Sequence, residues 1–300
     1  MKIWIVSPCY FDVKSFERVR QEVLASSSLD RSLPEIRFVL IDDSARQDAE
    51  VVTLRRHSDV FVITPPYNLG HQAALVFALR TLRQKIAPQD IVVTMDSDGE
   101  DRPADVPILV RSLMQNPSEL HRVSIARRTQ RKETLLFKLF YSCFKTLFLF
   151  STGTIVRNGN FVAFRGWFLE NLIFHPHFDQ CYASSFISLP LTITFVPLPR
   201  GNRFEGKSKM GYFGLVTHGI RMLMPFSEKI AVRGLVASSL GFVFFGALWK
   251  TIPAFVCLMF IGMFALLFAT FSQTKARSLR GLVEMTENTE PRSIKTDDLT

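Results

Sequence analysis

The chain has 300 residues, of which 36 are basic and 27 are acidic, so its formal net charge is +9. Hydrophobic residues make up 47% of the chain and charged residues 21%, which excludes a disordered protein. The four cysteines show no close pairing, so neither a disulfide framework nor a cysteine-based zinc site is expected. A basic balance favours nucleic acid or an anionic membrane as partner. Because 23 of the 28 phenylalanines lie after residue 130, we expect the membrane and no nucleic acid.

The first 127 residues alternate short apolar runs with amphipathic segments. Pro8 and Asp12 interrupt the apolar run at the N-terminus, so a first strand is expected there and not a secretory signal peptide. The runs that predict buried parallel strands are Ile3–Ser7, Ile36–Ile41, Val60–Thr64, Ile91–Met95 and Val123–Ala126. Helical spacing is found in Phe16–Leu24, His71–Ile86 and Ala104–Gln115. This alternation predicts a doubly wound, mostly parallel α/β sheet.

Acidic residues follow three of the predicted strands. Asp12 comes after the first strand, Asp42 and Asp43 after the second, and Asp96 and Asp98 after the fourth. The carboxyl ends of parallel strands meet at one edge of a sheet, where ligands bind. Several carboxylates at one edge repel one another unless a cation lies among them. Oxygen ligands without histidine or thiolate select a hard ion, so we expect Mg²⁺ or Mn²⁺.

Three other nucleotide or metal motifs are absent or incomplete. No glycine-rich dinucleotide fingerprint follows the first strand, which disfavours a nicotinamide or flavin enzyme. Gly99 is the fourth residue of the acidic loop, whereas an EF-hand calcium loop has its glycine at the sixth position. Residues 201–208 satisfy the phosphate-loop pattern, but the apolar C-terminal region follows too soon for the remaining units of a nucleotide-hydrolysing domain.

The C-terminal region contains apolar segments of two kinds. Residues 134–150 and 210–226 predict helices lying in the membrane surface, although the first could also be a core helix. Residues 229–274 hold two nearly uncharged runs that predict a transmembrane helical hairpin. The alternative, a buried hairpin of a soluble protein, lacks enough surrounding chain. Basic residues flank both ends of the hairpin, which places a domain of residues 1–228 and a disordered tail of residues 275–300 in the cytoplasm.

Taken in order, these motifs resemble glycosyltransferase family 2, and within it the polyprenyl-phosphate sugar transferases similar to dolichol-phosphate mannose synthase. The resemblance covers about residues 2–215. The matching motifs are Pro8-x-Tyr10, Asp42-Asp43-Ser44, Asn68-x-Gly70, Asp96-x-Asp98, Arg127 with Arg131, and Arg203-x-x-Gly206-x-Ser208-Lys209. The resemblance implies a GT-A-type (Rossmann-like) fold with a C-terminal two-helix membrane anchor.

The resemblance also implies a role for each motif. Residues that would bind the nucleotide-sugar donor are Pro8, Tyr10, Asp12, Asp43 and Asn68. Asp96 and Asp98 would hold the divalent ion against its diphosphate, with Asp98 among the catalytic residues. Arg127 and Arg131 would receive the phosphate of the acceptor lipid. The residues that would close over the phosphates are Arg203, Ser208 and Lys209.

One departure from the family pattern concerns the reaction itself. Asn160 stands where some members carry aspartate, and an amide cannot act as a general base. A lipid phosphate is largely dianionic at neutral pH and needs no proton removed. We therefore expect metal-dependent, inverting transfer of a hexose from UDP- or GDP-hexose to undecaprenyl or dolichyl phosphate, on the cytosolic face of the cytoplasmic (inner) membrane.

Other functions remain open from the sequence. A family 2 enzyme acting on a sugar hydroxyl of a lipid-linked or envelope glycan would need a base, for which Asp179 and Glu205 are candidates. Processive polysaccharide synthesis is disfavoured because no Gln-x-x-Arg-Trp element is present. A nucleotidyltransferase would not require a membrane hairpin, and a non-catalytic scaffold would leave the acidic residues unexplained. A two-helix anchor could also pack against copies of itself, which makes a homo-oligomer one of the expected assemblies.

Overall fold

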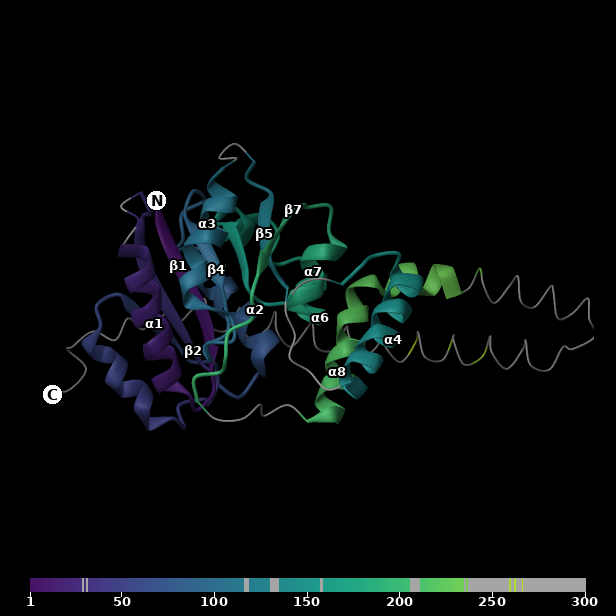
Figure 1. The fold of residues 1–300 in the computed structure, drawn as a ribbon, viewed down its shortest axis with the longest axis horizontal. Coiled ribbons are helices and arrows are strands. Elements are labelled where there is room, and N and C mark those ends of the chain that lie inside the picture. The colour runs from purple at the N-terminus through teal and green to yellow at the C-terminus, as the bar shows by residue number, and fades with distance from the viewer. Residues whose placement is uncertain are drawn as a thin grey trace, which may run out of the picture.

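The computed structural model describes residues 1–28, 30, 32–115, 119–129, 135–156, 159–205 and 211–234, together with residues 236, 259, 262 and 266. Within these residues a seven-stranded sheet has the strand order β3-β2-β1-β4-β6-β5-β7 (Figure 1). The strands are β1 (Lys2–Cys9), β2 (Glu35–Asp42), β3 (Val60–Ile63), β4 (Ile91–Thr94), β5 (Arg122–Arg128), β6 (Val162–Arg165) and β7 (Thr192–Leu198).

The sheet is mostly parallel, as the sequence predicts. β1 pairs in parallel with β2 and β4, β2 with β3, and β5 with β7. β6 lies between β4 and β5 and runs antiparallel to both. The five predicted strands are confirmed, whereas the reversed strand β6 was not predicted. The parallel pairing brings the carboxyl ends of β1, β2 and β4 to the same edge.

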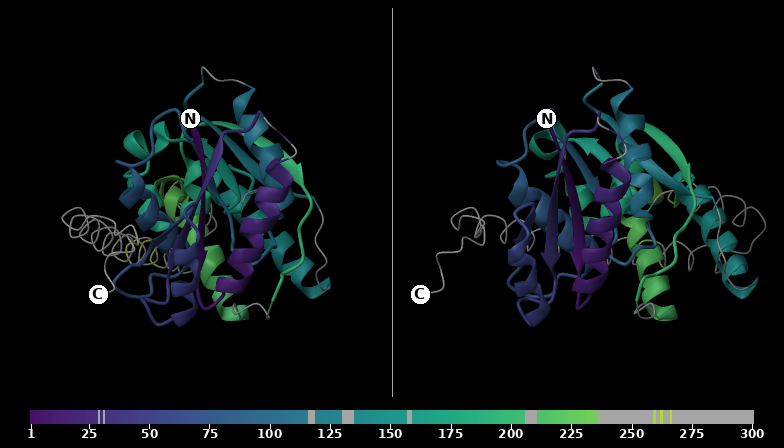
Figure 2. Two further views of the ribbon diagram at one scale, coloured as in Figure 1. Left: turned by 90° about the vertical axis from the view of Figure 1, so that its left-hand side faces the viewer. Right: turned by 60° about the vertical axis from the view of Figure 1, so that its left-hand side comes forward.

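Helices cover both faces of the twisted sheet (Figure 2). The helices are α1 (Val13–Ser28), α2 (His71–Leu82), α3 (Val106–Met114), α4 (Leu135–Thr152), α5 (Trp167–Asn171), α6 (Pro176–Gln180), α7 (Tyr182–Ser188) and α8 (Tyr212–Leu223), with short 3₁₀ turns η1 (Ala49–Arg56), η2 (Pro103–Asp105) and η3 (Met224–Phe226). The three helices predicted in the first 127 residues are confirmed as α1, α2 and α3, with different ends.

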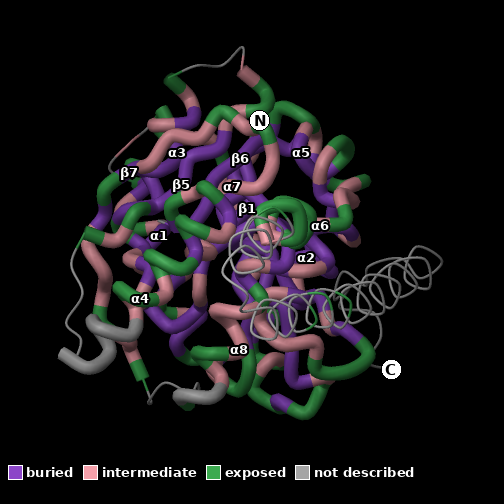
Figure 3. Tube along the Cα trace, turned by 90° about the vertical axis from the view of Figure 1, so that its right-hand side faces the viewer, coloured by how far each residue is buried: buried purple, intermediate pink, exposed green. Residues whose placement is uncertain are grey.

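Alternation along the strands divides the hydrophobic core into two layers. Ile3 and Ile5 of β1 pack with α1 and α3, whereas Trp4 and Val6 pack with α2 and α7 on the other face. Successive side chains of a strand point to opposite faces, so a strand with helices on both sides is apolar throughout. β1 and β6 are accordingly buried along almost their whole length (Figure 3).

Helices α4 and α8 pack against each other at one end of the molecule, away from α1 (Figure 1). A third cluster of buried side chains joins this helix pair to the start of α7. Phe148 of α4, Met222 of α8 and Phe226 pack there with Cys181 and Ala183. The α4–α8 pair is thus attached to the sheet domain through α7.

The predicted transmembrane hairpin falls almost entirely outside the described residues, as does the tail of residues 275–300. None of the helices in the described part of the chain combines the length and the hydropathy needed to cross a bilayer.

Candidate active site

The loops that follow β1, β2 and β4 meet at the carboxyl edge of the sheet. Cys9 at the end of β1 pairs with Asp42 at the end of β2. The Ser97 hydroxyl, just after β4, donates a hydrogen bond of 2.9 Å to the carbonyl oxygen of Pro8. The acidic residues that the sequence places after these strands therefore lie at one edge, yet their hydrogen-bond partners divide them into two groups.

The carboxylates after β2 are bound by the backbone. Asp42 accepts hydrogen bonds from the amides of Ser44 and Arg46, both at 3.1 Å. Asp43 accepts from the amides of Leu69 at 2.8 Å and Gly70 at 3.0 Å. These contacts tie the end of β2 to the segment that precedes α2.

Asn68 belongs to the same arrangement, because its Nδ2 donates to the Asp43 carbonyl at 3.0 Å. Gly70 next to it has φ of 76°, a conformation that side chains rarely adopt. Asp43 and Asn68, both predicted to bind the nucleotide-sugar, are thus brought together by the structure in a hydrogen-bonded turn.

Asp96, the first carboxylate after β4, contacts side chains instead. Its Oδ1 lies 2.9 Å from Nε2 of His71 and 3.4 Å from Nδ2 of Asn160. Burial favours the neutral acid, but the charge and hydrogen bond of His71 hold the pKa of Asp96 well below its usual range. Burial likewise disfavours the charged form of His71, and the charge of Asp96 raises the His71 pKa overall.

Two further carboxylates in this loop are paired with arginines. Asp98 Oδ2 lies 2.6 Å from Arg203 Nη2, and Asp101 Oδ1 lies 3.1 Å from Arg128 Nη2. Burial, followed by the charge of Asp96, raises the pKa of Asp98 and raises that of Asp101 to about 6. Each of these two carboxylates is thus buried, close to the charge of Asp96 and paired with one arginine.

The segment after β7 packs directly on this loop. The amides of Gly201 and Phe204 donate to the carbonyl oxygens of Glu100 and Asp98, both at 2.8 Å. A side chain at Gly99, where φ is 85°, would collide with the Phe204 ring at 2.7 Å. Residues 199–205 thus hold Arg203 against Asp98. Ser208 and Lys209, predicted to act with Arg203, lie outside the described residues, as does Arg131.

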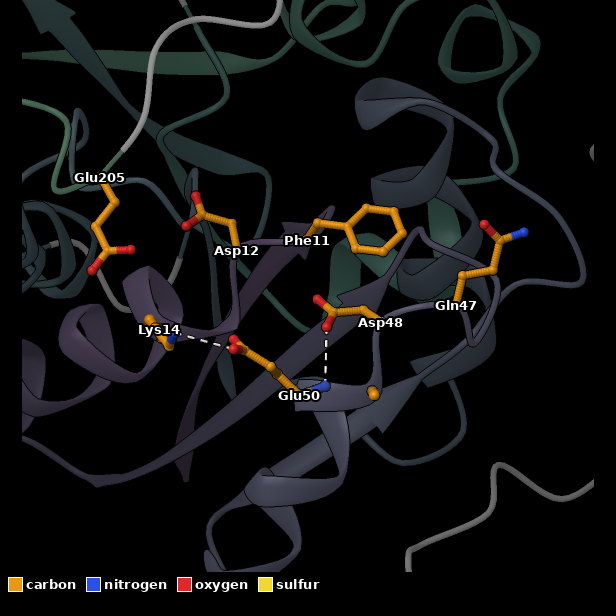
Figure 4. A pocket seen from close by; sticks show the side chains of 8 residues that line it. Phe11, Asp12, Lys14, Gln47, Asp48, Glu50 and Glu205 are labelled. Atoms are coloured by element: carbon orange, nitrogen blue, oxygen red, sulfur yellow. Dashed lines mark hydrogen bonds and ion pairs between the residues drawn. The ribbon is translucent and has the colours of Figure 1, made fainter.

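A pocket of about 420 Å³ opens beside this edge (Figure 4). It lies between the segments that follow β1 and β2, and its lining residues are Phe11, Asp12, Lys14, Gln47, Asp48, Ala49, Glu50 and Glu205. Lys14 Nζ is 3.1 Å from Glu50 Oε1, and Asp48 accepts the Glu50 amide at 3.0 Å. Asp12, which the sequence predicts to bind the donor, therefore lines a pocket. Tyr10, next to it, is 45% exposed and stacks edge-on against Phe11.

At the end of β5 two adjacent arginines differ in direction. Arg127, predicted to receive the acceptor phosphate, is exposed, whereas Arg128 binds the acidic loop through Asp101. Val123 and Ile125 pack on the α2 side of the sheet and Ala126 on the α1 side, so Arg128 follows Ala126 toward Asp101. Because every second residue of a strand points to the same face, the alternation could have predicted that Arg128 lies on the same side as Ala126.

The two candidate bases occupy very different places. The Asp179 side chain is fully buried and lies 2.5 Å from Arg80, which is also fully buried. A carboxylate enclosed in the core cannot reach a sugar hydroxyl, so Asp179 is wrong as a catalytic base. Glu205 lines the pocket beside Asp12.

His71, Gln72 and Arg128 are residues near this loop that sequence reasoning missed. In the described residues, no group of three or more histidine, cysteine, aspartate or glutamate side chains is arranged to hold a metal ion. Asp96 and Asp98 provide two carboxylates two residues apart, and both are oxygen ligands of the kind that hard divalent ions prefer.

Comparison with known proteins accounts for this arrangement. The chain is 23% identical over 293 residues to the undecaprenyl-phosphate 4-deoxy-4-formamido-L-arabinose transferase of Photorhabdus laumondii, covering 89% of this chain and 83% of the relative. The Proteus mirabilis enzyme of the same name is also 23% identical over 293 residues, covering 87% and 84%. The solved mannosyl-3-phosphoglycerate synthase of Rubrobacter xylanophilus shares the fold, with a TM-score of 0.50 and 14% identity over 78% of this chain and 75% of that one.

The sequence also matches a family profile over more than half its length. Residues 4–169 match the profile described as Glycosyl transferase family 2, and this span runs from β1 to α5 and contains the whole acidic loop. The chain therefore belongs to glycosyl transferase family 2 and is a glycosyltransferase.

Proposed function

We propose that this glycosyltransferase transfers a sugar from a nucleotide-sugar to a polyprenyl phosphate, with inversion at the anomeric carbon. The observation that carries the proposal is the acidic loop after β4, in which Arg203 contacts Asp98 and Arg128 contacts Asp101. His218 of the apolar α4–α8 pair interacts electrostatically with Asp96 of this loop. Two relatives that span most of the chain are undecaprenyl-phosphate sugar transferases by name, which supports the acceptor class.

The donor is expected along the carboxyl edge of the sheet. The pocket lined by Asp12 has room for a nucleoside, and Asp96 and Asp98 follow at the end of β4. Burial, followed by repulsion from Asp96, raises the pKa of Asp98. A bound divalent ion would stabilise the charged form of these carboxylates, which are oxygen ligands of the kind that Mg²⁺ or Mn²⁺ prefers. When bound, such an ion neutralises charge on the leaving diphosphate. Arg203 supplies further positive charge on the same side.

The nucleophile is an oxygen of the acceptor phosphate. It bonds to the anomeric carbon of the sugar while the bond from that carbon to the donor diphosphate breaks, releasing a nucleoside diphosphate. A dianionic phosphate needs no general base. This agrees with the amide at Asn160 and with the enclosure of Asp179, which leave Glu205 as the candidate base for a sugar hydroxyl acceptor.

The acceptor would arrive from the membrane along the α4–α8 pair. Leu147, Leu149 and Phe150 of α4 are exposed, with Phe150 77% accessible, and so are Leu215 and Val216 of α8. Exposed apolar side chains on neighbouring helices suit the headgroup region of a bilayer. We place this surface on the cytosolic face of the inner membrane, because basic residues flank the apolar C-terminal region.

The test uses the full-length protein in detergent or nanodiscs with labelled nucleotide-sugars and undecaprenyl phosphate. Donors should include UDP- and GDP-hexoses and a UDP-aminopentose, since the sequence predicts a hexose and the relatives are named for an arabinose derivative. Label in an acid-labile lipid that extracts into organic solvent is the expected result. Undecaprenol without phosphate is the control acceptor. Transfer to undecaprenol, or to glycan alone, would contradict the proposal.

A further inference from the structure

A chain of hydrogen bonds leads from the Asp96 carboxylate to the start of α7. Asn160 Nδ2 lies 3.4 Å from Asp96 Oδ1 and 2.7 Å from His71 Nε2. Asn160 Oδ1 accepts from Gln72 Nε2 at 2.7 Å, and Gln72 Oε1 accepts from the amide of Ala183 at 3.1 Å. The proposed function assigns no role to Asn160 or Gln72, the two side chains that make these contacts.

The direction of this chain can be deduced from its far end. A backbone amide only donates, so the Ala183 N–H requires the oxygen of Gln72 to face α7. The Gln72 nitrogen then faces Asn160 and requires the Asn160 oxygen there. The Asn160 nitrogen is left to face Asp96 Oδ1 and His71 Nε2. When Nε2 itself donates to Asp96, it cannot accept, so the Asn160 nitrogen donates to the carboxylate. The orientation of both amides is therefore determined by one unambiguous donor.

The backbone of Asn160 is also linked to α7, through the hydroxyl of Thr94. The Thr94 hydroxyl donates to the Asn160 carbonyl at 2.7 Å and lies 2.8 Å from the hydroxyl oxygen of Tyr182. Thr94 has a single hydroxyl hydrogen, so Tyr182 donates to Thr94. Both the side chain and the main chain of Asn160 are thus anchored to the first residues of α7, Tyr182 and Ala183.

We propose that Asn160 and Gln72 are positioning residues that fix the Asp96 carboxylate, with Gln72 acting only through Asn160. The amide donates a hydrogen bond without adding charge, whereas an aspartate at position 160 would add another anion beside Asp96, Asp98 and Asp101. The importance assigned to Asp96 rests on the proposed function. Hydrogen-bond partners behind a metal-binding side chain typically change metal affinity by about 10- to 100-fold.

The experiment compares four full-length proteins: wild type, Asn160→Ala, Gln72→Met and the double variant. Mn²⁺ binding is measured by electron paramagnetic resonance, with and without UDP or GDP. We expect Asn160→Ala and Gln72→Met each to weaken Mn²⁺ binding by about tenfold. The double variant should bind no more weakly than Asn160→Ala alone, since a residue that acts through another adds nothing once that other is removed. Asn171→Ala, which removes an exposed amide on α5, is the matched control and should bind as wild type does.

Two results would overturn the inference. The first is that Asn160→Ala binds Mn²⁺ with wild-type affinity. The second is that the fold-losses of Mn²⁺ affinity in the two single variants multiply in the double variant, which is expected if Gln72 only stabilises α7. The thermal unfolding temperature of each variant distinguishes a loss of Mn²⁺ affinity caused by lower stability from one caused by a misplaced Asp96 carboxylate. If the wild type itself binds no Mn²⁺, the metal assignment of the proposed function fails. The inference is then decided by the dissociation constants of UDP and GDP in the same four proteins, where the same non-additive pattern is expected.

Discussion

The carboxylates after β2 and those after β4 lie at the same edge of the sheet but have different surroundings. Asp42 and Asp43 are bound by backbone amides, which belong to fixed turns. Asp96, Asp98 and Asp101 lie beside cationic side chains, namely His71 and two arginines, although Asp98 and Asp101 each accept one backbone amide as well. Backbone amides stabilise a carboxylate permanently, whereas mobile cationic side chains can be exchanged for a ligand. We therefore propose that the first group mainly maintains the fold and that the second binds the donor.

The largest expected effect is on transfer in Asp98→Asn. Loss of this carboxylate should reduce transfer to undecaprenyl phosphate by at least about 100-fold, because charge on the leaving diphosphate is no longer compensated. Thermal stability should not fall, since the mutual repulsion in the loop decreases. Asp105→Asn, which changes a buried carboxylate of η2 that pairs with Arg102 and not with Arg203 or Arg128, is the control. Transfer at the wild-type rate in Asp98→Asn would contradict the division between the two groups.

Asp43→Ala should show the opposite pattern. Two backbone amides lose a charged acceptor, and such hydrogen bonds are worth about 1.5 to 3 kcal/mol each to stability. We expect the free energy of unfolding to fall by about 2 kcal/mol or more, measured by chemical denaturation. Turnover per folded molecule at saturating donor should change far less than in Asp98→Asn. Unchanged stability would show that Asp43 is not structural.

The two arginines at the end of β5 sharpen the comparison. Arg128→Ala leaves the buried Asp101 without its cation and should lower stability by about 1 to 3 kcal/mol. Arg127→Ala removes an exposed side chain, should change stability by less than about 0.5 kcal/mol, and should raise the KM for undecaprenyl phosphate. Denaturation and steady-state kinetics on both variants check this. Equal stability losses would contradict the assignment.

A smaller effect is expected at Arg203, whose guanidinium contacts the Asp98 carboxylate. Its removal should make Mn²⁺ alone bind about fivefold more tightly, corresponding to roughly 1 kcal/mol for a partly exposed ion pair. Donor affinity in the presence of Mn²⁺ should fall, because positive charge near the diphosphate is lost. Arg200→Ala, which removes the partner of Glu100, is the neighbouring control. Weaker Mn²⁺ binding in Arg203→Ala would contradict the idea that a metal ion replaces the Arg203 guanidinium at the Asp98 carboxylate.

The last prediction concerns a group remote from the acidic loop, where only the pH dependence of stability is expected to change. Burial, followed by the charges of His175 and Lys229, lowers the pKa of His177 to about 4. The neutral ring is favoured in the folded state, so its contribution to stability is complete above about pH 6.5 and is lost as the pH falls toward 4. His177→Gln should flatten thermal stability between pH 6.5 and 4. An unchanged pH profile would contradict this.

Much of the fold could be predicted because its signals are local. Buried parallel strands are continuous apolar runs, and all five in the first 127 residues were found in this way. β6 was missed because it has four residues, lies in a phenylalanine-rich region and ends at Arg165. Nothing in so short a segment distinguishes an antiparallel central strand from its apolar surroundings.

The acidic edge was also predictable, but not the partner of each acidic side chain. Asp43 and Asp98 both follow a strand, and only the tertiary structure shows that Leu69 and Gly70 reach one and Arg203 the other. The chain from Asp96 to Ala183 joins residues 87 positions apart, since 183 − 96 = 87. Such contacts leave no periodic trace in a sequence.

The central claim is that a phosphate oxygen of the acceptor attacks the sugar. Phosphorus-31 NMR of undecaprenyl phosphate during the reaction tests it most directly. We expect the phosphomonoester resonance to be replaced by that of a phosphodiester, in step with the appearance of free nucleoside diphosphate. Consumption of the donor with the monoester resonance unchanged would contradict the account.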